Sequence, residues 1–419
     1  MQHAVVDLLA VGALVTLLAV AYVHPSAAVE VLAGVVAAGV VVVSGGVDLG
    51  GTLDEIRLLL PVVAFLCGIL VVSALCAAEG VFAAVGAHVA RVGRGRPRRM
   101  LALTFTAAAV TTAVLSLDAT VVLLTPVVAA ATAGTTSSPR PLVNACVRLA
   151  NSASLLLPVS NLTNLLALPA LPTVSFVGFA TAMAPVWLAV IGVEYLGHRV
   201  FFARDLLVPV TAAPRAGKHA GPTVVPVVVV GLMLVGFAVL SPLGVEPAWV
   251  AGTAALVLAG HSLRRRTLGP AAVLRSAHVS FAIFVLCLGV VVAALTRTFL
   301  GDLVRAAVPD GNGLGSLLVV ALLATGLANV VNNLPATLLL VPMVAPLGVT
   351  AVLAALVGLG VGSGLTYTGS LANLLWRRTL ARQGTPPSAR DFHLLSALVT
   401  LPAVVVGTVV LWAWVPLVR

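Results

Sequence analysis

The sequence predicts an all-α polytopic membrane protein with two inverted repeats, made of about 10 transmembrane helices, two re-entrant helical hairpins and two unwound helices. Three observations predict this fold. Hydrophobic residues make up 60% of the chain and charged residues only 9%, whereas charged residues are about 25% of a soluble domain. Many apolar runs are long enough to cross a bilayer. Polar interruptions of the apolar runs in the first half return in the second half.

The net charge of +10 is distributed in short basic clusters between the apolar runs. Such clusters orient a membrane protein by staying on the cytoplasmic side, so they do not indicate nucleic-acid binding. The four cysteines lie inside apolar runs without CxxC spacing, which favours packing over disulfides or a metal site. We therefore expect a chain embedded in the lipid bilayer that needs no cofactor and no metal.

Residues 1–199 are expected to form the first repeat, because several apolar stretches there approach the roughly 20 residues that a spanning helix needs. The expected spans cover residues 4–23, 27–43, 58–78 and 173–196, and the hairpin and the broken helix cover residues 100–133 and 142–168. No basic residue precedes the first stretch, so we expect it to remain as a helix and not to be cleaved as a signal peptide.

A single acid interrupts the apolar run over residues 100–133. Asp118 lies near the middle of the run, between the hydroxyl residues Ser116 and Thr120. A charged side chain at the bilayer centre costs about 2.5 to 3.5 kcal/mol on insertion scales, so its surroundings must compensate. Polar residues at the centre of the run favour two half-depth legs that meet at a tip, and one tilted helix with a spur is the alternative.

The run over residues 142–168 is also interrupted near its middle. Pro158 is followed there by Ser160, Asn161, Thr163 and Asn164. Proline removes a backbone donor, and an unwound helix is tolerated at membrane depth only where it lines a cavity or is buried in protein. The sequence therefore predicts a broken helix that faces a cavity.

A hydrophilic stretch, residues 200–222, is expected to be a cytoplasmic linker before the second repeat, residues 223–419. The expected spans of the second repeat cover residues 224–240, 247–263, 273–295 and 392–415, with a hairpin at 314–346 and a broken helix at 350–376. The hairpin tip is expected at 329–335, where asparagines and a proline interrupt the apolar run.

The positive-inside rule tests this division of the chain. If each hairpin enters and leaves on one face, the basic clusters at 91–99, 264–266 and 377–390 all lie on the cytoplasmic side, and the acidic connection at 48–55 lies outside. Both termini are then expected on the extracytoplasmic side of the inner membrane. The same count inserts the two hairpins from opposite faces, which is the inverted-repeat plan of secondary transporters.

The repeat is visible in the residues themselves. Residues 154–166 align without gaps with residues 363–375, and this alignment pairs Asn164 with Asn373. Around the hairpin tips, Thr120 aligns with Thr337. Apolar matches are common in an apolar protein, but paired asparagines are not.

With these blocks in view, the chain resembles the arsenical pump membrane protein family, the arsenite and antimonite permeases of the ion transporter superfamily. The resemblance rests on residues 116–126, 160–164, 329–337 and, most specifically, 364–376 (GLTYTGSLANLLW). It implies export of trivalent arsenic or antimony as the neutral hydroxide, driven by the proton gradient or by a partner ATPase. It also implies a substrate site between the hairpin tips and the broken helices.

Asp118 is the candidate for proton coupling, because a carboxyl group in a partly dry cavity has its neutral form favoured. The alternative is that Asp118 caps the second leg of the hairpin, and the two roles can coexist. Other acids, such as Glu194, lie near the ends of spans where water is reachable, and Arg148 is expected to extend its charged group toward the interface.

The candidates for substrate binding are polar residues at the tips and breaks, because an uncharged trihydroxide needs hydrogen-bond donors and acceptors and no counter-ion. They are Ser116, Thr120, Asn161, Thr163, Asn164, Asn332, Asn333, Thr337, Thr366, Tyr367, Thr368, Ser370 and Asn373. For each, the alternative is that the side chain only satisfies the backbone at a helix end.

Other functions remain open on the sequence. A sodium-coupled carboxylate or sulfate transporter fits the same pattern, but an anionic substrate favours positive charge near the midplane. A sodium/proton antiporter would also use Asp118, normally with more buried acids. An enzyme is disfavoured because no nucleophile arrangement, metal cluster or phosphate-binding loop is evident.

Overall fold

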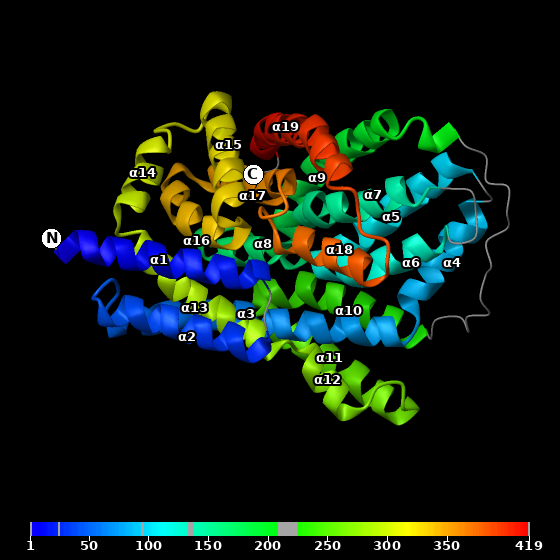
Figure 1. The fold of residues 1–419 in the computed structure, drawn as a ribbon, viewed down its shortest axis with the longest axis horizontal. Coiled ribbons are helices and arrows are strands. Elements are labelled where there is room, and N and C mark those ends of the chain that lie inside the picture. Colours follow the sequence, from blue (N-terminus) through cyan, green and yellow to red (C-terminus); the bar gives the residue numbers. More distant parts are fainter. Residues whose placement is uncertain (1, 24–25, 94–95, 133–137, 208–223, 418–419) are drawn as a thin grey trace.

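The computed structural model describes residues 2–23, 26–93, 96–132, 138–207 and 224–417, and all regular elements in these ranges are helical (Figure 1). Seven helices in the described ranges are long and apolar enough to cross a membrane, and shorter apolar helices such as α2 accompany them. The predicted all-α polytopic membrane fold is therefore confirmed. Arg94 of the basic cluster and most of the expected linker, including Lys218, lie outside the described residues.

The first half of the chain follows the predicted order, and one additional helix, α4, lies between the predicted span at 58–78 and the predicted hairpin. Its helices are α1 (Gln2–Val23), α2 (Ala27–Val43), α3 (Leu49–Ala78), α4 (Val81–Gly93), α5 (Pro97–Val114), α6 (Thr125–Ala130), α7 (Arg140–Ser152), α8 (Leu162–Ala167) and α9 (Phe176–Phe201). Helix α3 begins earlier than predicted, because the Asp48 side chain accepts the Gly51 N–H and caps it. The acidic connection is thus largely the first turns of α3.

The second half contains one short helix that was not predicted, α14, and the predicted span at 273–295 is divided between α12 and α13. Its helices are α10 (Val224–Leu240), α11 (Pro247–Arg265), α12 (Pro270–Ser276), α13 (Val279–Leu295), α14 (Phe299–Ala307), α15 (Leu314–Val331), α16 (Asn333–Val344), α17 (Val349–Val361), α18 (Leu371–Arg382) and α19 (Ala389–Trp414). The pairs α5–α6 and α15–α16 occupy the ranges of the predicted hairpins, and α7–α8 and α17–α18 occupy the ranges of the predicted broken helices.

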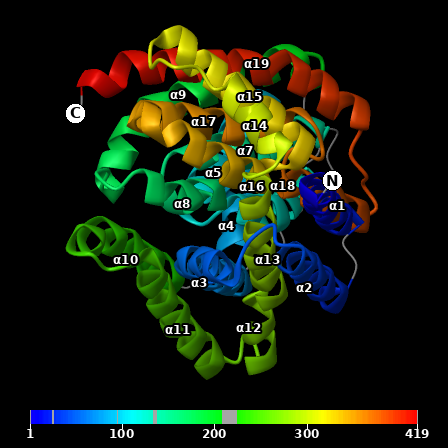
Figure 2. The ribbon, with the colours of Figure 1, turned by 90° about the vertical axis from the view of Figure 1, so that its left-hand side faces the viewer.

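The helices form two groups. Helices α1, α2, α3, α10, α11 and α13 pack on one another, and all of them except α1 lie along the lower side of Figure 2. The hairpins, the broken helices, α9 and α19 form the upper group, with α9, α15 and α19 at the top of the view. The strongest packing within the upper group joins α9 to α19, α15 to α17 and α5 to α7. The hairpin tips and the helix breaks come together where the two groups meet.

The two breaks are built in the same way. The Asn164 side-chain amide donates to the carbonyls of Ser154 and Leu157, at 2.8 and 3.0 Å. The Asn373 amide donates to the carbonyls of Ser363 and Thr366, at 3.0 and 2.8 Å. Each bond has its counterpart in the ungapped alignment of the two halves, which supports an internal repeat. The boundaries at 199 and 223 and the inverted orientation stay predictions.

Helix α7 carries a buried ion pair that the sequence interpretation missed. Arg148 is 1% exposed and Glu194 of α9 is 0% exposed, and the Arg148 Nη2 lies 2.6 Å from the Glu194 Oε1. Arg148 therefore does not reach the interface, and Glu194 does not reach water. Both expectations were wrong because each charge finds its partner on a helix that is distant in sequence.

Candidate functional site

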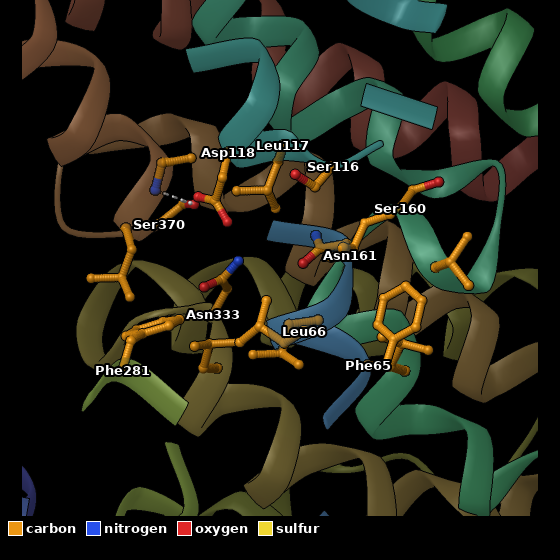
Figure 3. A pocket seen from close by; sticks show the side chains of 17 residues that line it. Phe65, Leu66, Ser116, Leu117, Asp118, Ser160, Asn161, Phe281, Asn333 and Ser370 are labelled. Carbon is orange, nitrogen blue, oxygen red and sulfur yellow. Dashed lines mark hydrogen bonds between the residues drawn. The ribbon is translucent and has the colours of Figure 1, made fainter. Parts of the chain in front are cut away.

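A cavity of about 50 Å³ lies where both hairpin tips and both helix breaks meet (Figure 3). We call residues 153–161, between α7 and α8, break 1, and residues 362–370, between α17 and α18, break 2. The polar lining comes from tip 1 (Ser116 and Asp118), tip 2 (Asn333), break 1 (Ser160 and Asn161) and break 2 (Ser370). Its apolar lining consists of Phe65, Leu66, Ile69, Leu117, Val159, Leu162, Leu165, Phe281, Leu334, Leu371 and Ala372. The cavity thus joins four segments that are far apart in the sequence, as the broken-hairpin interpretation predicts.

Tip 1 leaves its carboxylate free of the helix end. The Ser116 hydroxyl accepts the Ala119 N–H at 3.2 Å, whereas the Asp118 side chain makes no capping hydrogen bond. Ser116 therefore does the capping that the alternative interpretation assigned to Asp118. Figure 3 shows Asp118 and Asn333 directed toward the same space from different hairpins.

The backbone that follows Asp118 is a π-helical turn, Ala119–Leu124, and such turns are frequent at functional sites. Both the N–H and the hydroxyl of Thr125 donate to the Thr120 carbonyl. The Thr120 hydroxyl pairs with that of Thr112 at 2.7 Å. Thr120 therefore joins the two legs of the hairpin and does not line the cavity.

Hydrogen bonds join tip 2 to break 2. Asn332 has φ 73° and ψ 154°, a conformation that is strained for a residue other than glycine. Its side chain donates to the Thr368 carbonyl at 2.9 Å and accepts the Leu334 N–H at 3.3 Å. The Asn333 N–H donates to the Gly369 carbonyl at 3.0 Å, which leaves the Asn333 side chain in the cavity.

The two breaks present equivalent capping residues to the cavity. The Asn161 side-chain oxygen Oδ1 accepts the Thr163 N–H at 3.1 Å at the start of α8, and the Ser370 hydroxyl accepts the Ala372 N–H at 3.2 Å at the start of α18. Their backbones are nearly identical, with φ and ψ of −147° and 140° at Asn161 and −145° and 141° at Ser370. Because Ser370 and Ala372 line the cavity, the N-terminus of α18, which is the positive end of its dipole, faces the cavity.

The structure thus separates the candidate residues into two sets. Ser116, Asp118, Asn161, Asn333 and Ser370 line the cavity, whereas Thr120, Thr163, Asn164, Asn332, Thr337, Thr366, Tyr367, Thr368 and Asn373 do not.

Most of the second set stabilises the backbone around the breaks. The Thr337 hydroxyl donates to the Asn333 carbonyl at 2.6 Å, and the Thr366 and Thr368 hydroxyls donate to Asn329. Tyr367 stacks on Phe392 with ring centroids 4.2 Å apart. The Thr163 hydroxyl is buried without a partner among the described residues.

Sequence reasoning missed the apolar wall of the cavity. Phe65, Leu66 and Ile69 come from α3, and Phe281 comes from α13. No signal in the sequence distinguishes these residues from other apolar residues in a spanning helix. Ser160 lay inside the predicted break but was not among the candidates, and its hydroxyl also donates to the Ala113 carbonyl at 2.7 Å.

Asp118 is the single ionisable side chain among the described residues that line the cavity. That lining includes no arginine, lysine or histidine. Nor does any group of three His, Cys, Asp or Glu in the described ranges have the arrangement of a metal site. The cavity can therefore offer hydrogen bonds and one exchangeable proton, but no positive side chain to an anion.

Comparison with known proteins agrees with this architecture. The model of the citrate transporter family, CitMHS, matches residues 5–357. The arsenical pump membrane protein of Escherichia coli K12 is 29% identical over an alignment of 360 residues, and the match covers 81% of this chain and 82% of the relative. That of Yersinia enterocolitica is 28% identical over 396 residues, 88% of this chain and 90% of the relative. The predicted resemblance to arsenical pump membrane proteins is thereby confirmed. Because the family model covers most of its length, this chain belongs to the citrate transporter (CitMHS) family of membrane transporters.

Proposed function

We propose that the chain is a secondary active transporter that exports arsenite and antimonite, as neutral trihydroxides, across the inner membrane in exchange for protons. The observation that carries the proposal is the cavity between the tips and the breaks, whose described lining has one carboxyl group and no positive side chain. The similarity to proteins named arsenical pump membrane protein supports the same substrate class.

The polar lining suits a small uncharged solute. Ser116, Asn161, Asn333 and Ser370 each offer hydroxyl or amide groups, and α3 and α13 contribute apolar side chains to the same lining. A cavity of about 50 Å³ has room for only a few groups of the size of water. A trihydroxide matches this room and chemistry better than a tricarboxylate, which carries several negative charges.

Asp118 gives the proposal a coupling step. When ionised, the carboxylate accepts a hydrogen bond from a hydroxyl of the bound trihydroxide. When a proton binds to Asp118, one acceptor oxygen becomes a donor, and the hold on the solute weakens. Loading the solute at one face and the proton at the other then links outward movement of the solute to inward movement of the proton, while the trihydroxide stays chemically unchanged.

The family description, citrate transporter, favours a second candidate, a carboxylate transporter, for which we consider sodium as the coupling ion. Unwound carbonyls and tip asparagines also suit sodium, as in other secondary transporters. Against it stands the lack of a positive side chain in the described lining. A partner ATPase is an alternative energy source for arsenite export.

Everted vesicles from cells without other metalloid exporters test these possibilities together. With an imposed proton gradient, no ATP and no sodium gradient, we expect arsenite and antimonite to accumulate in vesicles that contain the chain. Vesicles without the chain are the control. In parallel right-side-out vesicles with an imposed sodium gradient, sodium-dependent accumulation of citrate would replace the proposal with the second candidate. A strict need for ATP and a second protein would remove proton coupling.

The orientation is part of the proposal. We infer that both termini lie on the extracytoplasmic side, because this places the basic clusters at 96–99, 264–266 and 377–390 in the cytoplasm. Membrane-impermeant thiol labelling of Leu243→Cys, in a variant without the native cysteines, tests it. Residue 243, between α10 and α11, is 73% exposed. It should react in intact spheroplasts, and reaction only in everted vesicles would reverse the assignment.

A further inference from the structure

Arg148 makes a set of contacts that the coupling step does not use. Its Nε and Nη2 atoms donate to the two carboxylate oxygens of Glu194, at 3.2 and 2.6 Å. Its Nη1 donates to the Gly364 carbonyl at 2.7 Å and to the Ser396 hydroxyl at 3.2 Å. The Ser152 hydroxyl completes the set by donating to Glu194 at 2.7 Å. One buried guanidinium thus connects α7, α9, α19 and break 2.

The contacted carbonyl lies in the 3-10 turn Gly362–Leu365, just before the segment that leads to the cavity residue Ser370. A Cβ atom at residue 364 would lie 2.7 Å from the Arg148 Nη1, so only glycine leaves room for the guanidinium. Asn151, one turn along α7, donates to Asn373 at 2.7 Å on the other side of the break. Helix α7 therefore holds break 2 at both ends.

The equivalent contact is missing from break 1. When the ungapped alignment of 154–166 with 363–375 is extended toward the N-terminus at the same offset, Arg148 corresponds to Val357 and Asn151 to Gly360, both in α17. Gly360 packs against Leu155 of break 1, where a Cβ atom would lie 3.0 Å from that side chain. The first break thus receives apolar packing from the second half, while the second break receives a charged donor from the first half.

We propose that Arg148 is a positioning residue for transport, held by Glu194, that fixes break 2 so that Ser370 and the start of α18 face the cavity. Only a guanidinium can do this, because its three nitrogens serve a carboxylate and a separate carbonyl at the same time. A lysine at this position would keep the charge beside Glu194 but would lose the geometry that reaches Gly364.

Two variants separate positioning from charge compensation. Arg148→Lys keeps a cation next to Glu194, and the double variant Arg148→Met with Glu194→Gln removes both buried charges, an exchange that proteins often tolerate. The matched control is Arg140→Lys on the same helix, whose arginine pairs with Asp391 at the edge of the protein and is 51% exposed. Hydrogen exchange of residues 362–370 in the purified full chain measures the effect without any substrate.

We expect Arg148→Lys and the double variant to raise exchange of residues 362–370 roughly tenfold or more, because a charge-assisted hydrogen bond to that segment is lost. Arg140→Lys should leave it unchanged. In vesicles, KM for arsenite should rise in both Arg148 variants while the level of inserted protein stays similar. If Arg148→Lys does not fold, the double variant decides alone.

Exchange at the wild-type rate in the variants would overturn the proposal. So would wild-type exchange and KM in the double variant, because the pair would then only neutralise charge. The inference rests on the proposed function for its KM readout alone. If the wild-type chain moves no metalloid but residues 362–370 still lose protection, the proposed substrate fails while the positioning role stands.

Discussion

The two hairpin tips occupy equivalent places in the two halves, but one presents an acid to the cavity and the other presents a neutral amide. Tip 1 presents Asp118, whose carboxylate is free of the helix end because Ser116 caps it, and a π-helical turn follows. Tip 2 presents Asn333 from the regular helix α16, and Asn332 fastens it to break 2. The difference indicates a division of roles: tip 1 is suited to exchange a proton, and tip 2 is suited to hold a solute against a fixed frame.

The largest expected effect comes from removing the acid of tip 1. Asp118→Asn should abolish proton-driven arsenite uptake into everted vesicles, because the amide cannot carry a proton at this site. The protein should stay folded and inserted, since Asp118 makes no capping hydrogen bond. Full activity with the asparagine would remove Asp118 from the coupling step.

The paired variant Asp118→Asn with Asn333→Asp sharpens the same test by moving the acid to tip 2. We expect no recovery of proton-driven uptake, because Asn333 sits on the fastened tip. Recovery would mean that the cavity needs an acid anywhere in its lining, and the two tips would then be interchangeable.

The next effect concerns stability at tip 2. Asn332→Ala removes the bond to the Thr368 carbonyl and the cap on Leu334, so the free energy of unfolding should fall by about 2 kcal/mol. Asn332→Gly loses the same bonds but accepts the positive φ, so it should be more stable than Asn332→Ala by about 1 kcal/mol. Thermal unfolding in detergent measures both, and equal losses would show that the backbone at 332 is not strained.

A smaller effect is expected from the side chain that tip 2 presents. Asn333→Ala should raise KM for arsenite roughly fivefold to tenfold, because one neutral hydrogen bond to the solute is lost. Asn144→Ala is the control, since that buried asparagine donates to the Arg140 carbonyl on α7, outside the cavity lining. An equal rise in both variants would show that Asn333 acts only through the fold.

The smallest effect returns to tip 1. Ser116→Ala removes the cap on Ala119 and should lower the free energy of unfolding by about 1 kcal/mol. Ser116→Thr keeps a hydroxyl and should recover most of the loss in the same thermal unfolding measurement. If Ser116→Ala unfolds at the wild-type temperature, the hydroxyl does not cap the second leg in solution.

Local sequence signals located the interruptions correctly but did not assign their side chains. Asn161 and Asn164 are close in sequence and chemically identical, yet Asn161 lines the cavity and Asn164 ties the carbonyls of break 1. In the same way, Asn333 lines the cavity, whereas the Asn332 side chain bonds to break 2. The direction in which a side chain points from an unwound segment depends on which nearby carbonyls are left unpaired, and this is a property of the folded backbone.

The sequence by itself determined that the chain is helical and membrane-embedded and where its apolar runs are interrupted, because a bilayer forces backbone groups to pair within a segment and tolerates interruptions only around a protected space. Only the tertiary structure decided that Arg148 meets Glu194 and Gly364, and that Phe65 and Phe281 close the cavity. These contacts join helices that are distant along the chain, and no local pattern of apolar and polar residues encodes which of them meet.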